Sequence, residues 1–407
     1  MKTSSSLFVL LAAALAASTA VLHAADPVVT NVVSAQRAGT KLVDITFNVS
    51  DADSNTLAMS VEVSDNNGTT FAIPVTALSG DLNVAATPTP AAKALVWDAA
   101  VNFNHQFKST MVVRVIANDG AQPAGMALIP AGPFEMGHAI NAAPVHTVTL
   151  SAFYMDKLEV SKALWDGVKT YADANGYTFS ATAGSAFPYL GGLHPVTANW
   201  FDAVKWCNAR SQKEGLTPVY YTDTAFTTVY KTGEFPVNFS IQPPYAKWSA
   251  NGYRLPTEAE WEKAARGTLV GKDYPWGDTI SPGDANYTIF DGVNYVRLSP
   301  WVGIADPPTT PVGFYDGGQL PPAGPNRANG YGLHDIIGNV REWCWDLYDY
   351  DTYYAISPAN DPRGPATSDH RIARSSNATT TGGGSVWGRS PTPPTFAGFG
   401  FRCARGL

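Results

Sequence analysis

The segment YGLHDIIGNVREWCWD, residues 331–346, places two carboxylates on either side of a tight turn. Asp335 and Glu342 are seven positions apart, and the Gly338-Asn339 pair between them is typical of a turn that exposes carbonyl oxygens. Hard cations such as Ca²⁺ bind about 6–8 carboxylate and carbonyl oxygens. The adjacent tryptophans would also suit a catalytic acid pair, in which an apolar pocket raises one pKa. The segment therefore predicts a calcium site, a catalytic carboxylate pair, or plain surface acids.

The composition favours a loop-rich protein with more than one domain. The chain has 407 residues, of which 45% are apolar and only 15% are charged, and it contains 36 Gly, 30 Pro and 11 Trp. Aromatic side chains must then supply much of the buried area. The formal charge of −7, without a basic run, argues against a nucleic-acid partner.

Residues 1–24 have the pattern of a secretory signal peptide. Lys2 precedes an apolar run from Leu7 to Ala17, and small residues follow. That run is too short for a good membrane span, and no later stretch stays apolar for the roughly 18 residues that a span needs. We expect an exported protein (periplasmic, cell-surface or secreted) without a membrane span, whose thiols meet an oxidising compartment.

The next region, residues 25–118, alternates between apolar and polar positions. From Val43 to Val49 every second residue is apolar, and Asn, Asp and Gly turns separate several such runs. This pattern predicts an immunoglobulin-like β-sandwich. Residues 119–124 have the composition of a linker, and residues 125–407 form the second domain.

Two helices are predicted in the second domain. Residues 200–213 place apolar residues on one helical face. In RLPTEAEWEKAARG, residues 254–267, Thr257 and Glu260 match a capping box, and Gly267 is placed to end the helix. The rest of the chain has no long periodic stretch. Loops of this length stay ordered only when metal ions, disulfides or aromatic clusters hold them.

The common signatures of enzymes are missing. The sequence has no G-x-S-x-G, no P-loop and no three-glycine dinucleotide fingerprint. Its seven histidines are scattered, without a metal-binding pair at helical spacing.

Eight motifs occur in an order that resembles the sulfatase-modifying factor domain, typified by formylglycine-generating enzyme. They are MALIPAGPFEMG (126–137), FYMDKLEVSKALWDGV (153–168), HPVTANWFDAVKWCN (194–208), YRLPTEAEWEKAARG (253–267), YPWGD (274–278), PVGFY (311–315), NGYGLHDIIGNVREWCWD (329–346) and GFGFRCA (398–404). The resemblance covers 125–407 and implies an α+β, C-type-lectin-like fold with little regular secondary structure.

The resemblance favours the calcium interpretation of residues 331–346. In the enzymes of this family, the matching segment wraps a structural calcium ion, and a second calcium site lies nearby. The implied ligands are Asp335, Gly338 (carbonyl), Val340 (carbonyl) and Glu342, with Asn286 and Asp306 for the second site.

The same resemblance argues against copper in this chain. The family's oxidases convert a cysteine of an unfolded sulfatase segment into formylglycine with a copper ion held by two thiolates. Thr380 and Ser385 occupy those two positions here, and no cysteine lies between residues 345 and 402. Hydroxyl groups do not replace thiolates as ligands of Cu(I). The family's iron-dependent members need an accompanying helical domain with an H-x-x-x-H-x-E helix, which this sequence lacks.

Two functions follow from these observations, together with a third structural interpretation. The first is an exported protein that binds an extended polypeptide or a glycan in a lectin-like groove without catalysis. The alternative is an active oxidase with a divergent site, acting on sulfatases or related substrates, and the third is a cell-surface adhesion or scaffold protein. Six residues map to or beside the family's substrate cleft, although each would also suit an ordinary packed or solvated position: Trp343, Arg374, Asn377, Ser385, Trp387 and Arg389.

The resemblance also implies one disulfide. The family's enzymes join the positions of Cys207 and Cys403, which would leave Cys344 free. The alternative is that Cys207 serves as a small buried apolar residue.

Overall fold

A computed structural model describes the chain outside residues 1–26, 53–55, 66, 68–72, 74, 86, 104–108, 119–122, 141, 187–191, 236–243, 282, 291–294, 298–308, 319–324, 350–352 and 376–383. The predicted signal peptide, most of the linker, Asp306, Asn377 and Thr380 therefore lie outside the described residues. None of the helices in the described part is long and apolar enough to cross a membrane.

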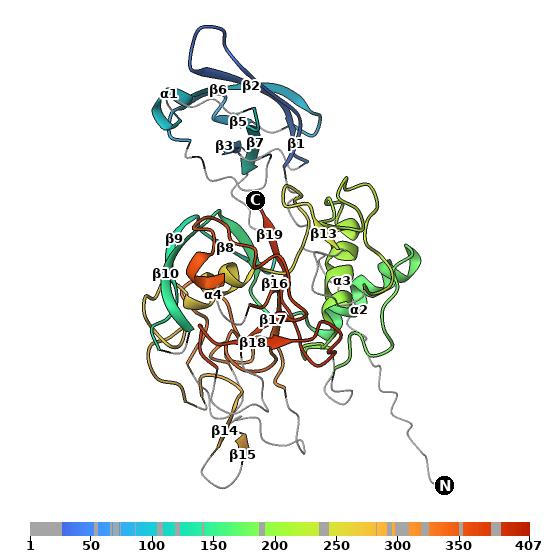
Figure 1. Ribbon diagram of the computed structural model, residues 1–407. Helices are drawn as coiled ribbons and strands as arrows, with labels where there is room; N and C mark the ends of the chain where they lie inside the picture. The colour runs from blue at the N-terminus through green and yellow to red at the C-terminus, as the bar shows by residue number, and fades with distance from the viewer. Residues whose placement is uncertain are drawn as a thin grey trace, which may run out of the picture.

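The N-terminal region consists of two antiparallel sheets that share one core. Apolar residues that alternate along the strands, such as Phe47 and Val61, meet between the sheets and pack around Trp97. Figure 1 shows this region as a separate layer of blue and cyan strands. The sheet orders are β1-β2-β6-β4 and β5-β3-β7, so the predicted β-structure is confirmed, whereas its immunoglobulin-like class stays a prediction. The elements are β1 (Val28–Gln36), β2 (Leu42–Ser50), β3 (Thr56–Ser64), β4 (Leu78–Gly80), β5 (Asn83–Ala85), β6 (Ala91–Asp98), α1 (Ala99–Asn102) and β7 (Val112–Asn118).

The described part of the larger C-terminal region combines short strands with four helices. Among the described residues its strands form small sheets of two or three, ordered β10-β9, β19-β11-β8, β12-β13, β14-β15 and β16-β17-β18. The elements are β8 (Met126–Ile129), β9 (Gly132–His138), β10 (Ala142–Leu150), β11 (Phe153–Asp156), α2 (Lys162–Ala174), α3 (Trp200–Lys213), β12 (Tyr220–Tyr221), β13 (Tyr245–Ala246), α4 (Glu258–Arg266), β14 (Thr288–Phe290), β15 (Tyr295–Arg297), β16 (Glu342–Leu347), α5 (Tyr353–Ile356), β17 (Arg371–Arg374), β18 (Arg389–Thr392) and β19 (Ala404–Gly406).

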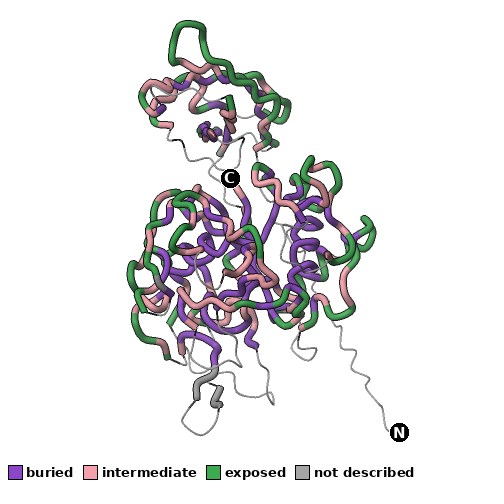
Figure 2. The backbone as a smooth tube through the Cα atoms, in the orientation of Figure 1, coloured by how far each residue is buried: buried purple, intermediate pink, exposed green. Residues whose placement is uncertain are grey.

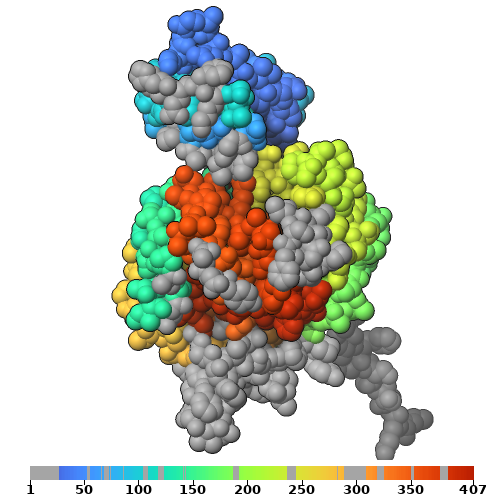
Figure 3. Space-filling model, in the orientation of Figure 1, coloured from blue at the N-terminus to red at the C-terminus, as the bar shows by residue number. Residues whose placement is uncertain are grey.

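The two ends of this region are joined in one sheet. Strand β11 pairs on one side with β8 and on the other with the C-terminal β19, where Phe153 faces Gly406. The C-terminal third of the chain, orange to red in Figure 3, forms much of the centre of the visible face. Closure by β19 means that the irregular segments between residues 268 and 400 are held at both ends.

Helix α3 is buried more completely than its sequence indicates. The apolar face was predicted correctly, but every residue from Trp200 to Ser211 is buried, including the charged ones. Each buried charge has a partner: Lys205 pairs with Asp202 at 2.9 Å, and Arg210 pairs with Asp156 at 2.7 Å. Figure 2 shows the helix within the purple, buried interior. Ion pairing therefore permits a burial that hydrophobic periodicity alone does not predict.

The capping box of α4 is confirmed. The backbone N–H of Glu260 donates to Thr257 Oγ1 at 3.2 Å, and the Glu260 carboxylate accepts from the Thr257 N–H at 2.8 Å. Gly267 ends the helix in the left-handed conformation with φ of 57°.

The three cysteines are all buried, and two of them are neighbours. The sulfur of Cys207 lies 3.7 Å from that of Cys403, whereas Cys344 belongs to a different part of the core. A disulfide requires about 2.05 Å between the sulfurs, so the structure records thiols. The bond itself stays a prediction, and the two residues that it would join lie side by side.

We predict that oxidation links Cys207 to Cys403 and leaves Cys344 reduced. The bond would close a loop of 196 residues, which contributes roughly 4–5 kcal/mol in the chain-entropy model. Non-reducing peptide mapping of the oxidised full chain checks the pairing, and Cys344→Ser serves as the matched control. A linkage that includes Cys344, or three free thiols after oxidation, would contradict the prediction.

Candidate functional site

The turn predicted between the two carboxylates is present and is unusually tight. Asp335 and Asn339 both adopt positive φ of 55°, and Gly338 has φ of 90°. A Cβ on Gly338 would lie 2.3 Å from the carbonyl oxygen of Asn286, so only glycine fits at this position. The Asn339 N–H donates to that same carbonyl at 2.9 Å. The turn is thereby fixed against a segment some fifty residues earlier.

Glu342 is fully buried and belongs to an ion pair. Its carboxylate accepts from Arg402 Nε at 2.8 Å and Nη2 at 2.7 Å, and from the indole N–H of Trp261 at 2.7 Å. Both carboxylate oxygens are therefore occupied by protein donors. A cation bound at Glu342, as the family resemblance implies, would have to share those oxygens.

Asp335 is placed differently. Its Oδ2 accepts from the N–H of Gly313 at 2.5 Å, whereas its Oδ1 is buried and receives no hydrogen bond from the described residues. Burial raises the pKa of this carboxyl to about 6. A buried carboxylate oxygen without a donor is the environment that a cation would stabilise.

A third carboxylate, which the sequence did not single out, lies beside these two. Glu159 is 2% exposed and accepts from the Asn339 amide at 2.6 Å and from the Val340 N–H at 3.2 Å. Burial raises the pKa of Glu159 well above its usual range, and the charges of Asp335 and Glu342 raise it further. Three buried carboxylates thus share one nearby cationic side chain, that of Arg402.

The donor set around the turn fits a hard cation in part. No hydrogen bond from the described residues occupies the carbonyls of Gly338 or Val340. In the same part of the chain, no group of three or more His, Cys, Asp or Glu side chains has a geometry that could hold a metal. An ion here would rest on Asp335 and carbonyl oxygens, with Asn286 buried beside the turn.

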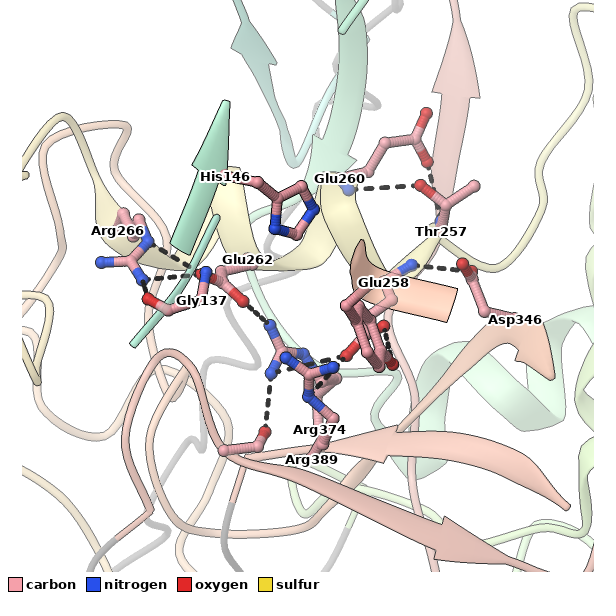
Figure 4. A network of polar contacts seen from close by, with 12 residues as sticks. Gly137, His146, Thr257, Glu258, Glu260, Glu262, Arg266, Asp346, Arg374 and Arg389 are labelled. Carbon is pink, nitrogen blue, oxygen red and sulfur yellow. Dashed lines mark hydrogen bonds and ion pairs between the residues drawn. The ribbon is translucent and has the colours of Figure 1, made fainter. Parts of the chain in front are cut away.

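Arg374 is buried at the centre of a polar network (Figure 4), and its place in or beside the substrate cleft stays a prediction. It donates to Glu262 at 2.5 Å and to the carbonyl of Gly388 at 2.8 Å. Glu262 also accepts from Arg266 at 2.7 Å and from the Gly137 N–H at 2.7 Å. Arg374 therefore links α4 to β17 and to the segment just before β18.

The side chains of Trp343 and Arg389 also make contacts within the protein. Trp343 is fully buried, packs against Phe399 at 5.1 Å and donates to the Ala198 carbonyl, and its place in or beside the cleft stays a prediction. Arg389 stacks over Tyr354, with 3.5 Å to the ring centre, and approaches Glu258 at 3.4 Å. Strand β18 places Arg389 at the rim of the buried network, and it is partly exposed.

The remaining cleft candidates lie beside a small surface of aromatic and polar groups. Trp387 is half-buried, stacks on His138 with ring centres 4.8 Å apart, and donates its indole N–H to Asp273 at 2.7 Å. His138 Nε2 lies 3.6 Å from the same carboxylate. Ser385 comes two residues before Trp387 and is mostly buried. We call His138, Asp273 and Trp387 the Trp387 surface.

No pattern in the sequence singled out His138 or Asp273. They lie 249 and 114 residues from Trp387 along the chain, and neither belongs to a recognisable ligand or catalytic pattern. Only the folding of β9 and of the loop after α4 onto the segment before β18 brings them together.

A family model described as the sulfatase-modifying factor enzyme 1-like domain matches residues 113–406. This chain therefore belongs to that family. The match begins inside β7, somewhat earlier than the predicted start at residue 125.

Several known proteins resemble this chain. The formylglycine-generating enzyme of Streptomyces coelicolor is 34% identical over 314 residues, covering 69% of this chain and 88% of that enzyme. The chaperone protein LppX of Paenibacillus barcinonensis is 34% identical over 214 residues, covering 50% of this chain and 65% of the chaperone. Among solved structures, Treponema denticola variable protein 1 is 28% identical with a TM-score of 0.50, covering 69% of this chain and 95% of that one. The relatives therefore include both an enzyme and proteins whose names indicate no catalysis.

We predict that Arg374→Met lowers the free energy of unfolding by about 3–5 kcal/mol, because it leaves Glu262 buried with part of its counter-charge removed. Urea denaturation of the full chain measures the change. The matched control is Lys169→Met, which removes an exposed ion pair to Asp173 and is expected to cost less than about 1 kcal/mol. Unchanged stability in Arg374→Met would contradict this structural role of Arg374.

Proposed function

We propose that this protein is a non-oxidase member of the sulfatase-modifying factor family that binds an extended polypeptide at the Trp387 surface. The observation that carries the proposal is the partly exposed stack of Trp387 on His138 beside Asp273. It lies two residues from Ser385, one of the two positions where the resemblance expects a copper thiolate. Rings supply contact area at low entropy cost, and the carboxylate and imidazole supply orientation.

The number and the burial of the cysteines argue against copper-thiolate chemistry. The complete sequence has three cysteines, and all of them are buried in the structure. Burial raises the pKa of the Cys344 and Cys403 thiols well above the ordinary value, which disfavours the thiolate that a metal needs. Hydroxyl groups at residues 380 and 385 do not provide the missing ligands.

Polypeptide is the better-supported ligand, with a glycan as the alternative. A formylglycine-generating enzyme and a chaperone protein are each 34% identical to this chain over the matched residues, and a chaperone by name acts on polypeptide. A sulfatase is one candidate partner, since the family model takes its name from sulfatase modification. The proposed signal peptide would place this interaction outside the cytoplasm.

An active oxidase is the second candidate function. It is favoured by the coverage of 88% of the Streptomyces coelicolor enzyme. This activity would need an oxidising centre that does not use the family's cysteine pair.

We also propose that a calcium ion stabilises the turn at residues 335–342. The supporting observations are the buried Asp335 Oδ1, the carbonyls of Gly338 and Val340, and the excess of buried carboxylates. Calcium would add positive charge beside the buried carboxylates of Asp335, Glu342 and Glu159, which Arg402 alone does not balance. The role of this ion would be structural.

Replacing Trp387 with Ala is expected to weaken binding of an extended peptide at least tenfold, because the stacked ring provides the exposed apolar contact. Fluorescence anisotropy with a library of labelled, unstructured peptides measures this, and a glycan array runs in parallel. Phe396→Ala is the matched control, since Phe396 is an exposed aromatic residue that packs on Phe399 and is not part of the Trp387 surface. Equal affinity in both variants would show that the Trp387 surface is not the binding site. Binding confined to the glycan array would show that the ligand is a glycan and not a polypeptide.

Calcium is expected to raise the melting temperature relative to excess chelator. Ligand at roughly 100–1,000 times its Kd stabilises the bound state by about 3–4 kcal/mol. Asp335→Asn should abolish this calcium-dependent shift. Glu342→Gln should lower the melting temperature with or without calcium, because Arg402 loses its partner. Identical melting curves in calcium and in chelator for the unmodified protein would contradict the proposal.

A further inference from the structure

A serine and a histidine outside the Trp387 surface form a hydrogen-bonded pair. Ser357 Oγ lies 3.3 Å from His146 Nε2, and the other ring nitrogen, Nδ1, lies 3.0 Å from the carbonyl oxygen of Pro144. His146 belongs to β10 and Ser357 follows α5, so 211 residues separate them along the chain. In Figure 4 the ring of His146 lies beside the buried network around Arg374 and has no hydrogen bond to it. The pair is therefore separate from the sites described above.

The Pro144 carbonyl fixes which ring nitrogen of His146 is protonated. A carbonyl oxygen only accepts hydrogen bonds, so in the neutral imidazole Nδ1 bears the proton and donates it to Pro144. Nε2 is then unprotonated and accepts from the Ser357 hydroxyl. Among the described residues, the ring nitrogens have no other partner. The free electron pair of the imidazole is thus directed at the proton of a serine hydroxyl.

This arrangement matches the one that activates a serine for nucleophilic attack. It consists of a hydroxyl, a base within hydrogen-bonding reach, and a third group that orients the base. Here the third group is the backbone carbonyl of Pro144. The distance of 3.3 Å is slightly longer than the roughly 2.6–3.2 Å of a productive contact, as is common before substrate binds.

The chain after Ser357 is fixed to β10, the strand that bears the histidine. The Thr149 N–H donates to the Ala359 carbonyl at 2.7 Å, and the Asp361 N–H donates to the Thr149 carbonyl at 2.9 Å. The Asp361 carboxylate also accepts from the N–H and hydroxyl groups of Ser151, at 2.7 and 2.8 Å. The N–H of Ala359 has no hydrogen-bond partner among the described residues, so it is a free donor two positions after the serine. Attachment to one strand sets the separation of the serine and the histidine.

The surroundings of the pair are accessible and uncharged. His146 and Ser357 are both partly exposed, and Ile356 is 77% exposed. Residues 142–148 and 353–360 contain no Asp, Glu, Lys or Arg. A neutral substrate with an apolar group suits these surroundings better than a charged one, because a charged group would find no counter-charge in either segment.

The geometry points to Ser357 as a nucleophile toward neutral carboxylic esters with a short apolar acyl chain, and to His146 as its general base. Ser357 Oγ forms a bond to the carbonyl carbon of the ester, while its proton passes to His146 Nε2. The bond from that carbon to the alcohol oxygen then breaks, and the alcohol leaves with the proton from His146. Water attacks the acyl-serine in the same way, which releases the acid and restores the Ser357 hydroxyl. The net reaction converts ester and water to acid and alcohol.

The test incubates the full chain with p-nitrophenyl butyrate, which releases coloured p-nitrophenolate when a serine is acylated. Absorbance measures the release, and peptide mapping after an acid quench locates the butyryl group. We expect one butyryl group per chain, on Ser357. Ser357→Ala and His146→Gln should each lower the rate of release at least tenfold, because the first removes the nucleophile and the second removes the base.

Two matched controls separate this chemistry from ordinary surface reactivity. Ser185→Ala removes an exposed serine whose hydroxyl donates to the Thr182 carbonyl at 2.6 Å. His370→Gln removes a partly exposed histidine that contacts Asp369 at 2.6 Å. Both variants should release p-nitrophenolate at the rate of the unmodified protein.

A fluorophosphonate probe provides a second measurement that does not depend on how well the histidine variant folds. In the unmodified chain it should label Ser357 and leave Ser185 unlabelled, because only an activated serine displaces the fluoride. Butyryl groups found only on lysines or the N-terminus, or acylation of Ser357 at a rate that a folded His146→Gln variant does not change, would overturn the inference. The hydrogen bond would then only attach the segment after α5 to β10, and Ser357→Ala would lower the melting temperature without changing the release.

Discussion

The buried ion pair between Glu342 and Arg402 is the interaction on which the larger region depends. Both side chains are fully buried, and the guanidinium donates two near-parallel hydrogen bonds to the carboxylate. The same guanidinium also donates to the carbonyls of Asp156, Lys157 and His334, between 3.0 and 3.2 Å. One side chain therefore ties together the end of β11, the turn before β16, β16 itself and the C-terminal segment. In a region with few regular elements, this satisfies backbone groups that no helix or sheet would otherwise pair.

The pattern of one arginine satisfying several segments recurs. Arg374 joins α4, β17 and the loop before β18, and Arg210 joins α3 to Asp156 at the end of β11. Buried charges are costly alone, but each of these has a carboxylate within hydrogen-bonding distance. The surroundings of Asp335 are an exception, because the charge excess there is negative and favours a cation.

The local features of the fold were predictable from the sequence, because they depend on neighbouring residues. The alternation in β2 and β3, the capping box at Thr257 and the turn at Gly338 all follow from short-range patterns. The burial of Arg374 and Trp343 did not, since a charged or aromatic side chain can be buried only where a distant partner meets it. For Arg374 that partner is 112 residues away in sequence. In the Trp387 surface, only Trp387 was a predicted site residue. His138 and Asp273 were not predicted, because they lie far from Trp387 along the chain.

We have proposed that this family member binds polypeptide without oxidising it. The most direct measurement is mass spectrometry of an unfolded, cysteine-containing sulfatase segment after incubation with the full chain, copper and oxygen. The formylglycine-generating enzyme of Streptomyces coelicolor serves as the positive control in the same reaction. Our account predicts that the segment co-purifies with the protein while its cysteine is unchanged. Conversion of that cysteine to formylglycine would contradict it.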